Sequence, residues 1–289
     1  MKLNENPYHV YNHGHFVLFR NHKDFVYFIN KFAILSSELH LQILAVTAMS
    51  THFHVVIECM NQDLIDEFLI QLKKTYGLYY HNKYGGSTSR QIKTAYKQLE
   101  NLQVIKNTMV YVYRNPVHHY IANYPLEYEY SSVCTLFADC LMPSEIYQQY
   151  ISNFRTLDKL SYIEKRLIYG KMKCHTDFQY NSKGMIVFSS FVNQKRARAI
   201  WGGFVRNFIK DMNQLPTDTS DVIIDDDVID LRTNGLSDID VCKIIDDYAA
   251  QLHLKSFHFF NEEQLSTIIK VLQKKSVPQA QIKRCLWLN

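Results

Sequence analysis

Two apolar runs on either side of a very short polar connection constrain the fold of this chain most strongly. The runs Gln42–Met49 and Phe53–Cys59 are both predicted to be β-strands, and they flank the tight Ser50-Thr51 connection. So short a connection can join antiparallel neighbours, whereas parallel strands need a crossover of a dozen or more residues. The sequence therefore predicts an antiparallel hairpin.

Other elements surround this hairpin. Strand pieces are expected at Tyr8–Tyr11 and His15–Phe19, joined by a turn whose Gly14 can take a positive φ. The remaining predicted elements are a helix over Lys23–Leu39, a helix over Gln62–Tyr80 that stops near Gly85-Gly86, a strand over Ile92–Tyr96 and a helix over Leu102–Arg114. The order β-α-β-β-α-β-α is that of a ferredoxin-like α+β layer with an antiparallel sheet.

The second predicted hairpin strand opens with His52-Phe53-His54. Side chains at positions i and i+2 of a strand point to the same face, so both imidazoles could hold one divalent ion while Phe53 points into the opposite layer. The local alternative is a chance pair in a chain that has 13 histidines. The pair by itself leaves both interpretations open.

A second pattern lies in the predicted helix that carries Tyr111 and Asn115. Residues four apart on a helix share one face, so a phenol and a carboxamide oxygen could be presented together. We expect this helix to end near Asn115, because Pro116 disfavours the helical conformation in the residue before it. The alternative is that Tyr111 and Tyr113 are ordinary aromatics of an amphipathic helix in a chain with 20 tyrosines.

Together, the His-hydrophobic-His strand and the later Tyr-x-x-x-Asn-Pro-Val helix resemble the single-tyrosine HUH transposases, and most closely the REP-associated tyrosine transposases. The resemblance covers roughly residues 5–140. Differences are His118-His119 and His13, at places where the family commonly has Arg. Further family-like stretches occur in the right order: Pro7–Gly14, Ala45–Thr51, Tyr124-Pro125 and Tyr130–Ser132.

The resemblance implies a palm-like antiparallel sheet with helices on one face, followed by a mainly helical C-terminal region. It also implies that Tyr111 attacks single-stranded or hairpin DNA and forms a 5′-phosphotyrosine intermediate. In this interpretation His52, His54 and Asn115 hold Mg²⁺ or Mn²⁺, which acts as a Lewis acid on the phosphate. Glu58 is a rival third ligand, but it lies roughly 13 Å along the strand from His54.

Two alternative classes remain. A domesticated, binding-only DNA- or RNA-binding protein of the same fold would not cleave, and a relaxase or replication initiator would use a second tyrosine or a lysine. Tyr113 lies roughly 200° around the helix from Tyr111 and cannot share its site. Whether the protein is a homodimer, with Tyr111 acting on a partner's metal, stays open.

Lysines close to these motifs in sequence are candidates for contacting the DNA backbone or, equally, for a solvated face. They are Lys93, Lys97 and Lys106.

The chain is predicted to contain a catalytic domain over residues 1–140, a helical extension over 141–215 and a helical C-terminal region over 216–289. The last region holds three candidate N-caps, at Ser237, Asn261 and Ser276. Glu262–Gln273 and Pro278–Trp287 have the proportions of a helix-turn-helix, with an ordinary helical hairpin as the alternative. In the helix-turn-helix, the side chains facing DNA would be Gln279, Gln281, Lys283 and Arg284.

Composition is consistent with a globular protein, with 47% hydrophobic and 21% charged residues. The net charge of +4 permits a nucleic-acid partner without requiring one. The six cysteines form no Cys-x-x-Cys pair, so neither a zinc knuckle nor a disulfide framework is expected. Because no signal-peptide core or long apolar stretch is found, we expect a cytoplasmic protein without a membrane partner.

Overall fold

The computed structural model describes residues 6–88, 92–213 and 235–288. The strands are β1 (Asn6–His13), β2 (Gln42–Ala48), β3 (Phe53–Cys59), β4 (Lys93–Gln98), β5 (Arg155–Thr156) and β6 (Gln179–Tyr180). The helices are α1 (His22–Glu38), α2 (Asp63–Tyr84), α3 (Leu102–His118), α4 (Ala138–Leu141), α5 (Ser144–Ser152), α6 (Tyr162–Tyr169), α7 (Gln194–Ala199), α8 (Val205–Asn213), α9 (Asp238–Gln251), α10 (Glu262–Lys274) and α11 (Gln279–Leu286).

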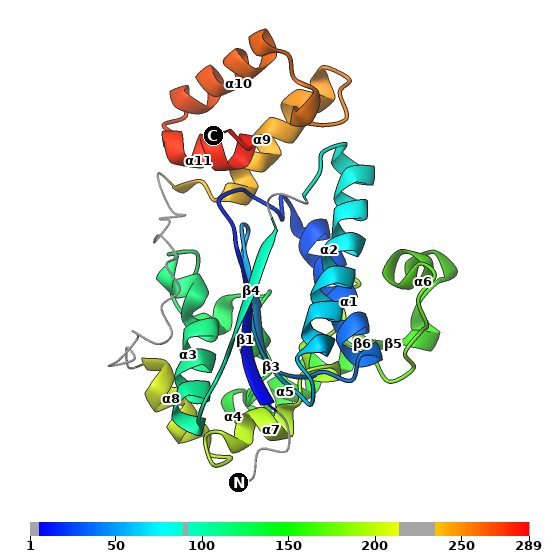
Figure 1. Ribbon diagram of the computed structural model, residues 1–289, viewed down its shortest axis with the longest axis vertical. Coiled ribbons are helices and arrows are strands. Elements are labelled where there is room, and N and C mark those ends of the chain that lie inside the picture. Colours follow the sequence, from blue (N-terminus) through cyan, green and yellow to red (C-terminus); the bar gives the residue numbers. More distant parts are fainter. Residues whose placement is uncertain (1–5, 89–91, 214–234, 289) are drawn as a thin grey trace.

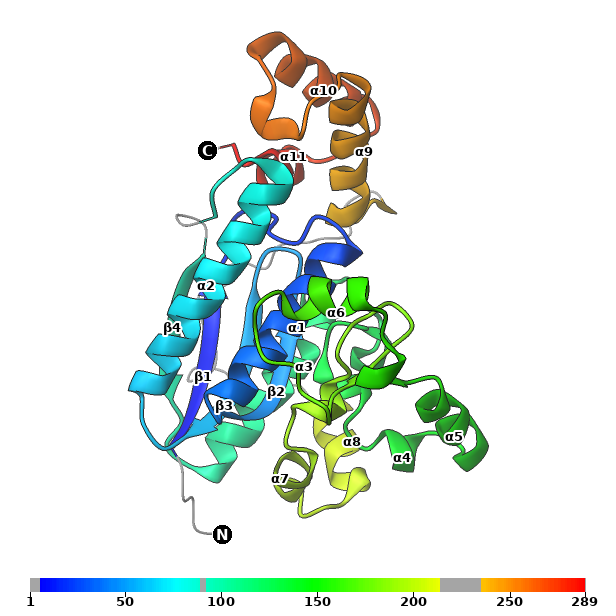
Figure 2. The same cartoon turned by 90° about the vertical axis from the view of Figure 1, so that its right-hand side faces the viewer.

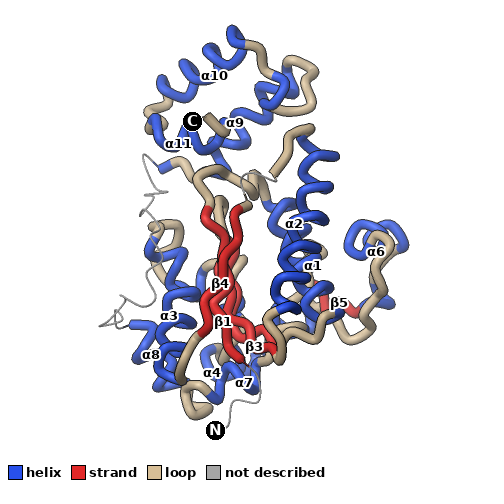
Figure 3. Tube along the Cα trace, viewed as in Figure 1, coloured by secondary structure: helices blue, strands red, loops and turns tan. Residues whose placement is uncertain are grey.

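The predicted hairpin and the predicted element order are both confirmed. Strands β2 and β3 are antiparallel neighbours in a sheet with the order β2-β3-β1-β4, and every pairing in it is antiparallel. The elements follow one another as β1-α1-β2-β3-α2-β4-α3, and the region after α3 is mainly helical (Figure 3). The α+β class is therefore confirmed.

The sheet is covered on both faces, and not on one face as expected (Figure 1). Strand β3 sends Phe53, Val55 and Ile57 into a core shared with α1 and α2. Its alternate residue Val56 packs on the opposite face, in a core shared with α3. Since successive side chains of a strand point to opposite faces, an apolar side chain on each face needs a helix on each face.

The segment after β1 differs from the prediction. His15–Phe19 is not a strand, because the backbone amides of Leu18 and Phe19 bond to the Ser50 carbonyl, 2.8 and 3.0 Å away. Gly14 has no positive φ, although the sequence suggested one. Its role is close approach: a Cβ at this position would lie 1.9 Å from the Thr51 carbonyl oxygen.

Helix α3 continues past Pro116 to His118, so the predicted end near Asn115 is wrong. The amide of His119 bonds to the Asn115 carbonyl at 3.0 Å, and the Pro116 carbonyl accepts from the amides of Ile121 and Ala122. These bonds satisfy carbonyls that would otherwise be left open at the helix end. The last turn therefore persists despite the proline.

The outer edge of β2 is covered by chain segments that follow α3. The Val46 amide bonds to the Ser132 hydroxyl at 3.0 Å, and the Asn193 amide bonds to the Ile43 carbonyl at 2.8 Å. Such cover removes an open strand edge that could pair with another chain. In the extension the sequence predicts helices over Ile146–Phe154 and Tyr162–Met172, and α5 and α6 lie near these places. Among the described helices, none combines the length and apolar character needed to cross a membrane.

The three C-terminal helices form one unit around their own apolar core, above the end of the sheet in Figure 2. The predicted N-caps at Ser237 and Asn261 are both present, each as part of a capping box. The expected cap at Ser276 is wrong, because α11 begins after Pro278 and has no side-chain cap. The polar, acidic sequence over Pro216–Asp230 predicts a linker, and this segment lies outside the described residues.

Arg20 joins this unit to the sheet domain. Its buried guanidinium donates to the Asp246 carboxylate at 2.6 Å and to the Cys285 carbonyl at 2.7 Å, and it lies 4.3 Å from the centre of the Phe257 ring. Trp287 stacks on Tyr80 of α2, with ring centres 5.0 Å apart. The C-terminal unit is thus docked by the ion pair of buried Arg20 with Asp246 and by aromatic packing.

His258 lies half-buried within this docking surface. Its ring lies 5.0 Å from Trp287, and its Nε2 lies 3.3 Å from the Tyr80 hydroxyl. Burial, with a smaller contribution from the positive charge of Arg20, lowers the pKa of His258 to about 4. The unfolded chain therefore takes up this proton first, near pH 6.5, and the folded state loses stability as the pH falls from 6.5 towards 4.

We predict that the melting temperature falls by several degrees between pH 7 and pH 5, and that His258→Gln removes most of this dependence on pH. The control is His15→Gln, at an exposed position, which should keep the wild-type pH dependence. Thermal unfolding followed by circular dichroism at several pH values measures both. An unchanged pH dependence in His258→Gln would contradict this role.

Candidate functional site

The two histidines of the His-Phe-His motif lie side by side at the start of β3. His54 is within the strand and points to the face that carries α3, while His52 is the last residue of the connecting loop. Their ring centres are 5.1 Å apart, and both side chains are almost fully buried. Phe53 points into the other core, and the two imidazoles lie together on the opposite side.

Helix α3 brings the other two motif residues to these histidines. The Asn115 carboxamide oxygen lies 2.9 Å from His52 Nε2. The Tyr111 ring stands edge-on to His54, with ring centres 5.2 Å apart. Asn115 is fully buried and Tyr111 is half-buried, so the phenol is the more accessible of the two. The structure therefore gathers all four predicted residues from two separate chain segments.

Two neighbouring side chains are directed elsewhere. Tyr113 is fully buried and its hydroxyl donates to the Leu44 carbonyl at 3.1 Å, in agreement with the prediction that it cannot share the site of Tyr111. Glu58 lies on the same face of β3 as His54, but its carboxylate is 2.5 Å from the Arg196 guanidinium of α7. Glu58 is therefore engaged in an ion pair away from the two histidines.

Two further histidines, His9 and His119, lie beside His54 and His52. No role in the site was predicted for them from the sequence. His9 of β1 has its Nε2 3.2 Å from His54 Nδ1, and the His119 ring centre is 4.9 Å from that of His52. Tyr11 pairs across the sheet with His54, which fixes the face to which β1 sends both Tyr11 and His9. A Tyr-His-Val-Tyr strand was visible in sequence, but its pairing with β3 was not.

Strand β4 places two of the predicted DNA-contacting lysines on this same face. Lys93 pairs with His13 and Lys97 pairs with His9 in the β1–β4 ladder. Both lysines are exposed, and Tyr11 and His13 are half-exposed. Since α3 packs on β2 and β3, the accessible part of this face lies over β1 and β4. Lysines on an edge strand also discourage pairing with other chains, which is the structural alternative.

The other predicted DNA contacts have different outcomes. Lys106 pairs with Asp211 of α8 at 2.5 Å and so has a partner within the protein. Arg284 is buried and its Nε bonds to both Asp238 oxygens, at 2.9 and 3.0 Å, so the prediction that it faces DNA is wrong. Gln281 is fully buried as well. Lys283 and Gln279 are exposed on α11. The burial of Arg284 and Gln281 follows from packing against α9, which the local helical pattern does not reveal.

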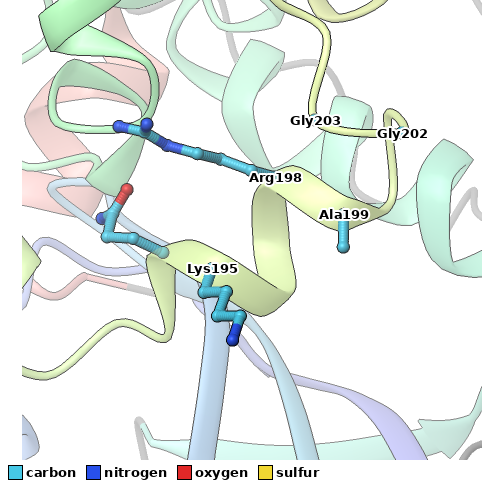
Figure 4. Close-up of a pocket in the computed structure, with 6 residues that line it drawn as sticks. Lys195, Arg198, Ala199, Gly202 and Gly203 are labelled. Atoms are coloured by element: carbon cyan, nitrogen blue, oxygen red, sulfur yellow. The ribbon is translucent and has the colours of Figure 1, made fainter.

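Two residues of the basic run Lys195–Arg198, Lys195 and Arg198, line a separate cleft of about 740 Å³ at α7, with the Gly202-Gly203 turn on its other side. Arg198 extends away from this turn (Figure 4) and pairs with Asp139 at 2.6 Å. Arg196 of the same run holds Glu58. Much of the basic run therefore neutralises carboxylates of the protein itself.

The donor set at His52, His54 and Asn115 is compatible with a divalent ion. The 2.9 Å between His52 Nε2 and the Asn115 oxygen is close to the separation of about 3 Å between adjacent ligands in an octahedron with bonds of about 2.1 Å. The contact of His54 Nδ1 with His9 makes Nε2 the nitrogen that would coordinate. Throughout the described ranges, no group of three or more His, Cys, Asp or Glu side chains is arranged to hold a metal. A metal here would therefore depend on the amide of Asn115.

Substitutions can distinguish Asn115 from Glu58 as the third metal ligand. Asn115→Ala should weaken Mn²⁺ binding by on the order of tenfold. Glu58→Gln should leave Mn²⁺ affinity unchanged but lower the free energy of unfolding by about 3 kcal/mol, because it removes the carboxylate that neutralises half-buried Arg196. Titration of Mn²⁺ followed by electron paramagnetic resonance and urea unfolding measure the two effects. If Glu58→Gln lost Mn²⁺ binding while Asn115→Ala kept it, Glu58 would be the third ligand.

No protein-family model matches the sequence, and no curated protein matches it. One solved structure is similar in part, a REP-associated tyrosine transposase bound to a REP hairpin. The match has 15% sequence identity and a TM-score of 0.39, and it covers 49% of this chain and 84% of that one. So distant a likeness identifies neither a family nor a function.

Proposed function

We propose that this protein cleaves and rejoins single-stranded DNA, with Tyr111 as the nucleophile. The observation that carries the proposal is the meeting of Tyr111 and Asn115 of α3 with His52 and His54 of the β2–β3 hairpin. A phenol, two imidazoles and a carboxamide oxygen in one half-buried site suit phosphoryl transfer through a covalent intermediate.

A tyrosine at its ordinary pKa of about 10 is only about 0.1% ionised at neutral pH. It therefore needs help both in losing its proton and in reaching an activated phosphate. A divalent ion held by His52, His54 and Asn115 would supply a Lewis acid for a phosphate oxygen. The edge-on packing of Tyr111 against His54 restricts the ring, so less motion has to be frozen when DNA binds.

The proposed cleavage forms one bond and breaks one bond. The Tyr111 oxygen bonds to phosphorus as its proton leaves, and the bond from phosphorus to the 3′-oxygen breaks. That 3′-oxygen takes up a proton and becomes a free hydroxyl, while the phosphate stays on Tyr111 through its 5′ side. Attack by a 3′-hydroxyl on this phosphotyrosine reverses the step, so rejoining needs no nucleotide hydrolysis.

Replacing the nucleophile tests the chemistry apart from binding. Tyr111→Phe removes one oxygen and keeps the ring, so hairpin-DNA affinity should stay within about twofold while cleavage and the covalent adduct disappear. Tyr113→Phe is the matched control on the same helix and should form the adduct at the wild-type rate, at a stability cost of about 1 kcal/mol for the lost bond to the Leu44 carbonyl. Adducts are measured by denaturing gel with labelled hairpin DNA and Mn²⁺.

The outcomes distinguish the remaining alternatives. If Tyr111→Phe still formed the covalent adduct, the nucleophile would be another residue. A wild-type protein that binds hairpin DNA but never forms an adduct would favour the binding-only class.

The exposed lysines of β4 are proposed to guide the DNA backbone to this site. Lys93 and Lys97 flank the half-exposed Tyr11 and His13 on one face, an arrangement in which cations track phosphates and rings stack on bases. Changing both lysines to Gln should weaken binding of unstructured single strands and lower the salt dependence of log K by roughly 1.4.

The control for these lysines is the pair Lys73 and Lys74 on α2, which packs on the opposite face of the sheet. Their double change to Gln removes the same charge and should leave affinity unchanged. Fluorescence anisotropy at several salt concentrations measures both pairs. Equal losses of affinity in the two double variants would show a non-specific charge effect.

Exposed Lys283 of α11 is proposed to contact the duplex stem of a hairpin, so Lys283→Gln should weaken hairpin binding more than single-strand binding.

A further inference from the structure

The loop that carries His52 is held by a residue far away in the chain. Ser50, in the middle of the β2–β3 connection, donates its hydroxyl to the Asp238 carboxylate of α9 at 2.9 Å. Its carbonyl accepts the amides of Leu18 and Phe19 at 2.8 and 3.0 Å. Ser50 is buried, so none of these bonds is readily replaced by water. The loop is therefore anchored to the C-terminal unit and to the segment after β1.

Asp238 is itself fixed in place. It is 3% exposed, and its carboxylate accepts from Arg284 Nε at 2.9 and 3.0 Å and from Gln281 Nε2 at 3.1 Å. The buried positive charge of Arg284 balances the buried Asp238 carboxylate. The two residues that donate to Asp238 here, Arg284 and Gln281, both belong to α11. The orientation of the carboxylate is thus set by the packing of α9 on α11, and Ser50 must meet it there.

The link continues from Ser50 to the imidazole of His52. The Thr51 hydroxyl lies 2.8 Å from His52 Nδ1, and Thr51 is fully buried. Gly14 lies against the Thr51 carbonyl so closely that a Cβ there would be 1.9 Å away. The Met49 amide bonds to the His52 carbonyl at 2.7 Å and closes the loop. A displacement of Ser50 therefore cannot be absorbed within the loop and would turn the His52 ring.

We propose that Asp238, acting through Ser50, is a positioning residue for His52, and that α9, α10 and α11 together support the site in this way. This assigns the C-terminal unit a role in catalysis besides DNA binding, and it rests on the proposed function of the site. Residues that orient a ligand or a catalytic imidazole through one hydrogen bond typically contribute 10- to 100-fold to activity or affinity.

The test removes one hydrogen bond and follows His52 directly. In Ser50→Ala, the ¹⁵N resonances of the His52 imidazole, assigned with His52→Gln, should shift or broaden without metal or DNA. The kcat for hairpin cleavage should fall by about tenfold, with KM for the DNA unchanged. Unchanged His52 resonances together with unchanged kcat would overturn the proposal.

Two controls separate positioning from a loss of stability. Asn261→Ala removes the N-cap of α10 in the same C-terminal unit, and Ser36→Ala removes a buried serine bond to the Ala33 carbonyl in α1. Both should lower the melting temperature, yet leave the His52 resonances and kcat unchanged. A loss of kcat in the controls equal to that in Ser50→Ala would reduce the role of Ser50 to stability. If wild type never cleaves DNA but Ser50→Ala still shifts His52, the proposed function fails and the positioning stands.

Discussion

Strand β3 buries polar side chains on one face, and much of the surrounding structure serves to satisfy them. Phe53, Val55 and Ile57 point into the core of α1 and α2, which leaves His54 and Glu58 on the other face. A buried polar group without a partner costs several kcal/mol, so each of these side chains requires one. His9 contacts His54 and Arg196 neutralises Glu58. The register of β1 and the docking of α7 both follow from this need.

The same requirement operates between the sheet and the C-terminal unit. Arg20 is fully buried and would be costly without Asp246 and the Cys285 carbonyl. Asp238 in turn is neutralised by Arg284 and bonded by Ser50. Asp238 and Asp246 lie 188 and 226 residues along the chain from Ser50 and Arg20, so the unit is joined to the sheet domain by long-range contacts. Removing one partner would leave its mate buried and unpaired.

The candidate site combines rigid and accessible parts. His52 and Asn115 are buried and bonded to each other, whereas Tyr111 is half-buried and stands beside the accessible surface over β1 and β4. A site of this kind keeps its imidazoles and amide in fixed positions while leaving the phenol within reach of a long substrate. The last turn of α3 remains helical through Pro116, which holds Asn115 at the distance that His52 requires.

The sequence by itself determined the local elements and the central motif. Alternation and helical spacing predicted the β2–β3 hairpin, the order of the first seven elements, and the faces shared by His52 with His54 and by Tyr111 with Asn115. These patterns depend on neighbours a few residues apart, which is why they can be read from one chain. The end of α3 was misjudged because later amides, those of His119, Ile121 and Ala122, complete its last turn.

Only the tertiary structure decided which side chains gather around the motif. His9 meets His54 across 45 residues of sequence, and Arg284 turns from an expected DNA contact into the buried partner of Asp238. Both outcomes depend on strand register and on the packing of α11 against α9. Such contacts arise from burying apolar surface of distant segments together, a long-range cooperative choice that the local pattern of either segment does not contain.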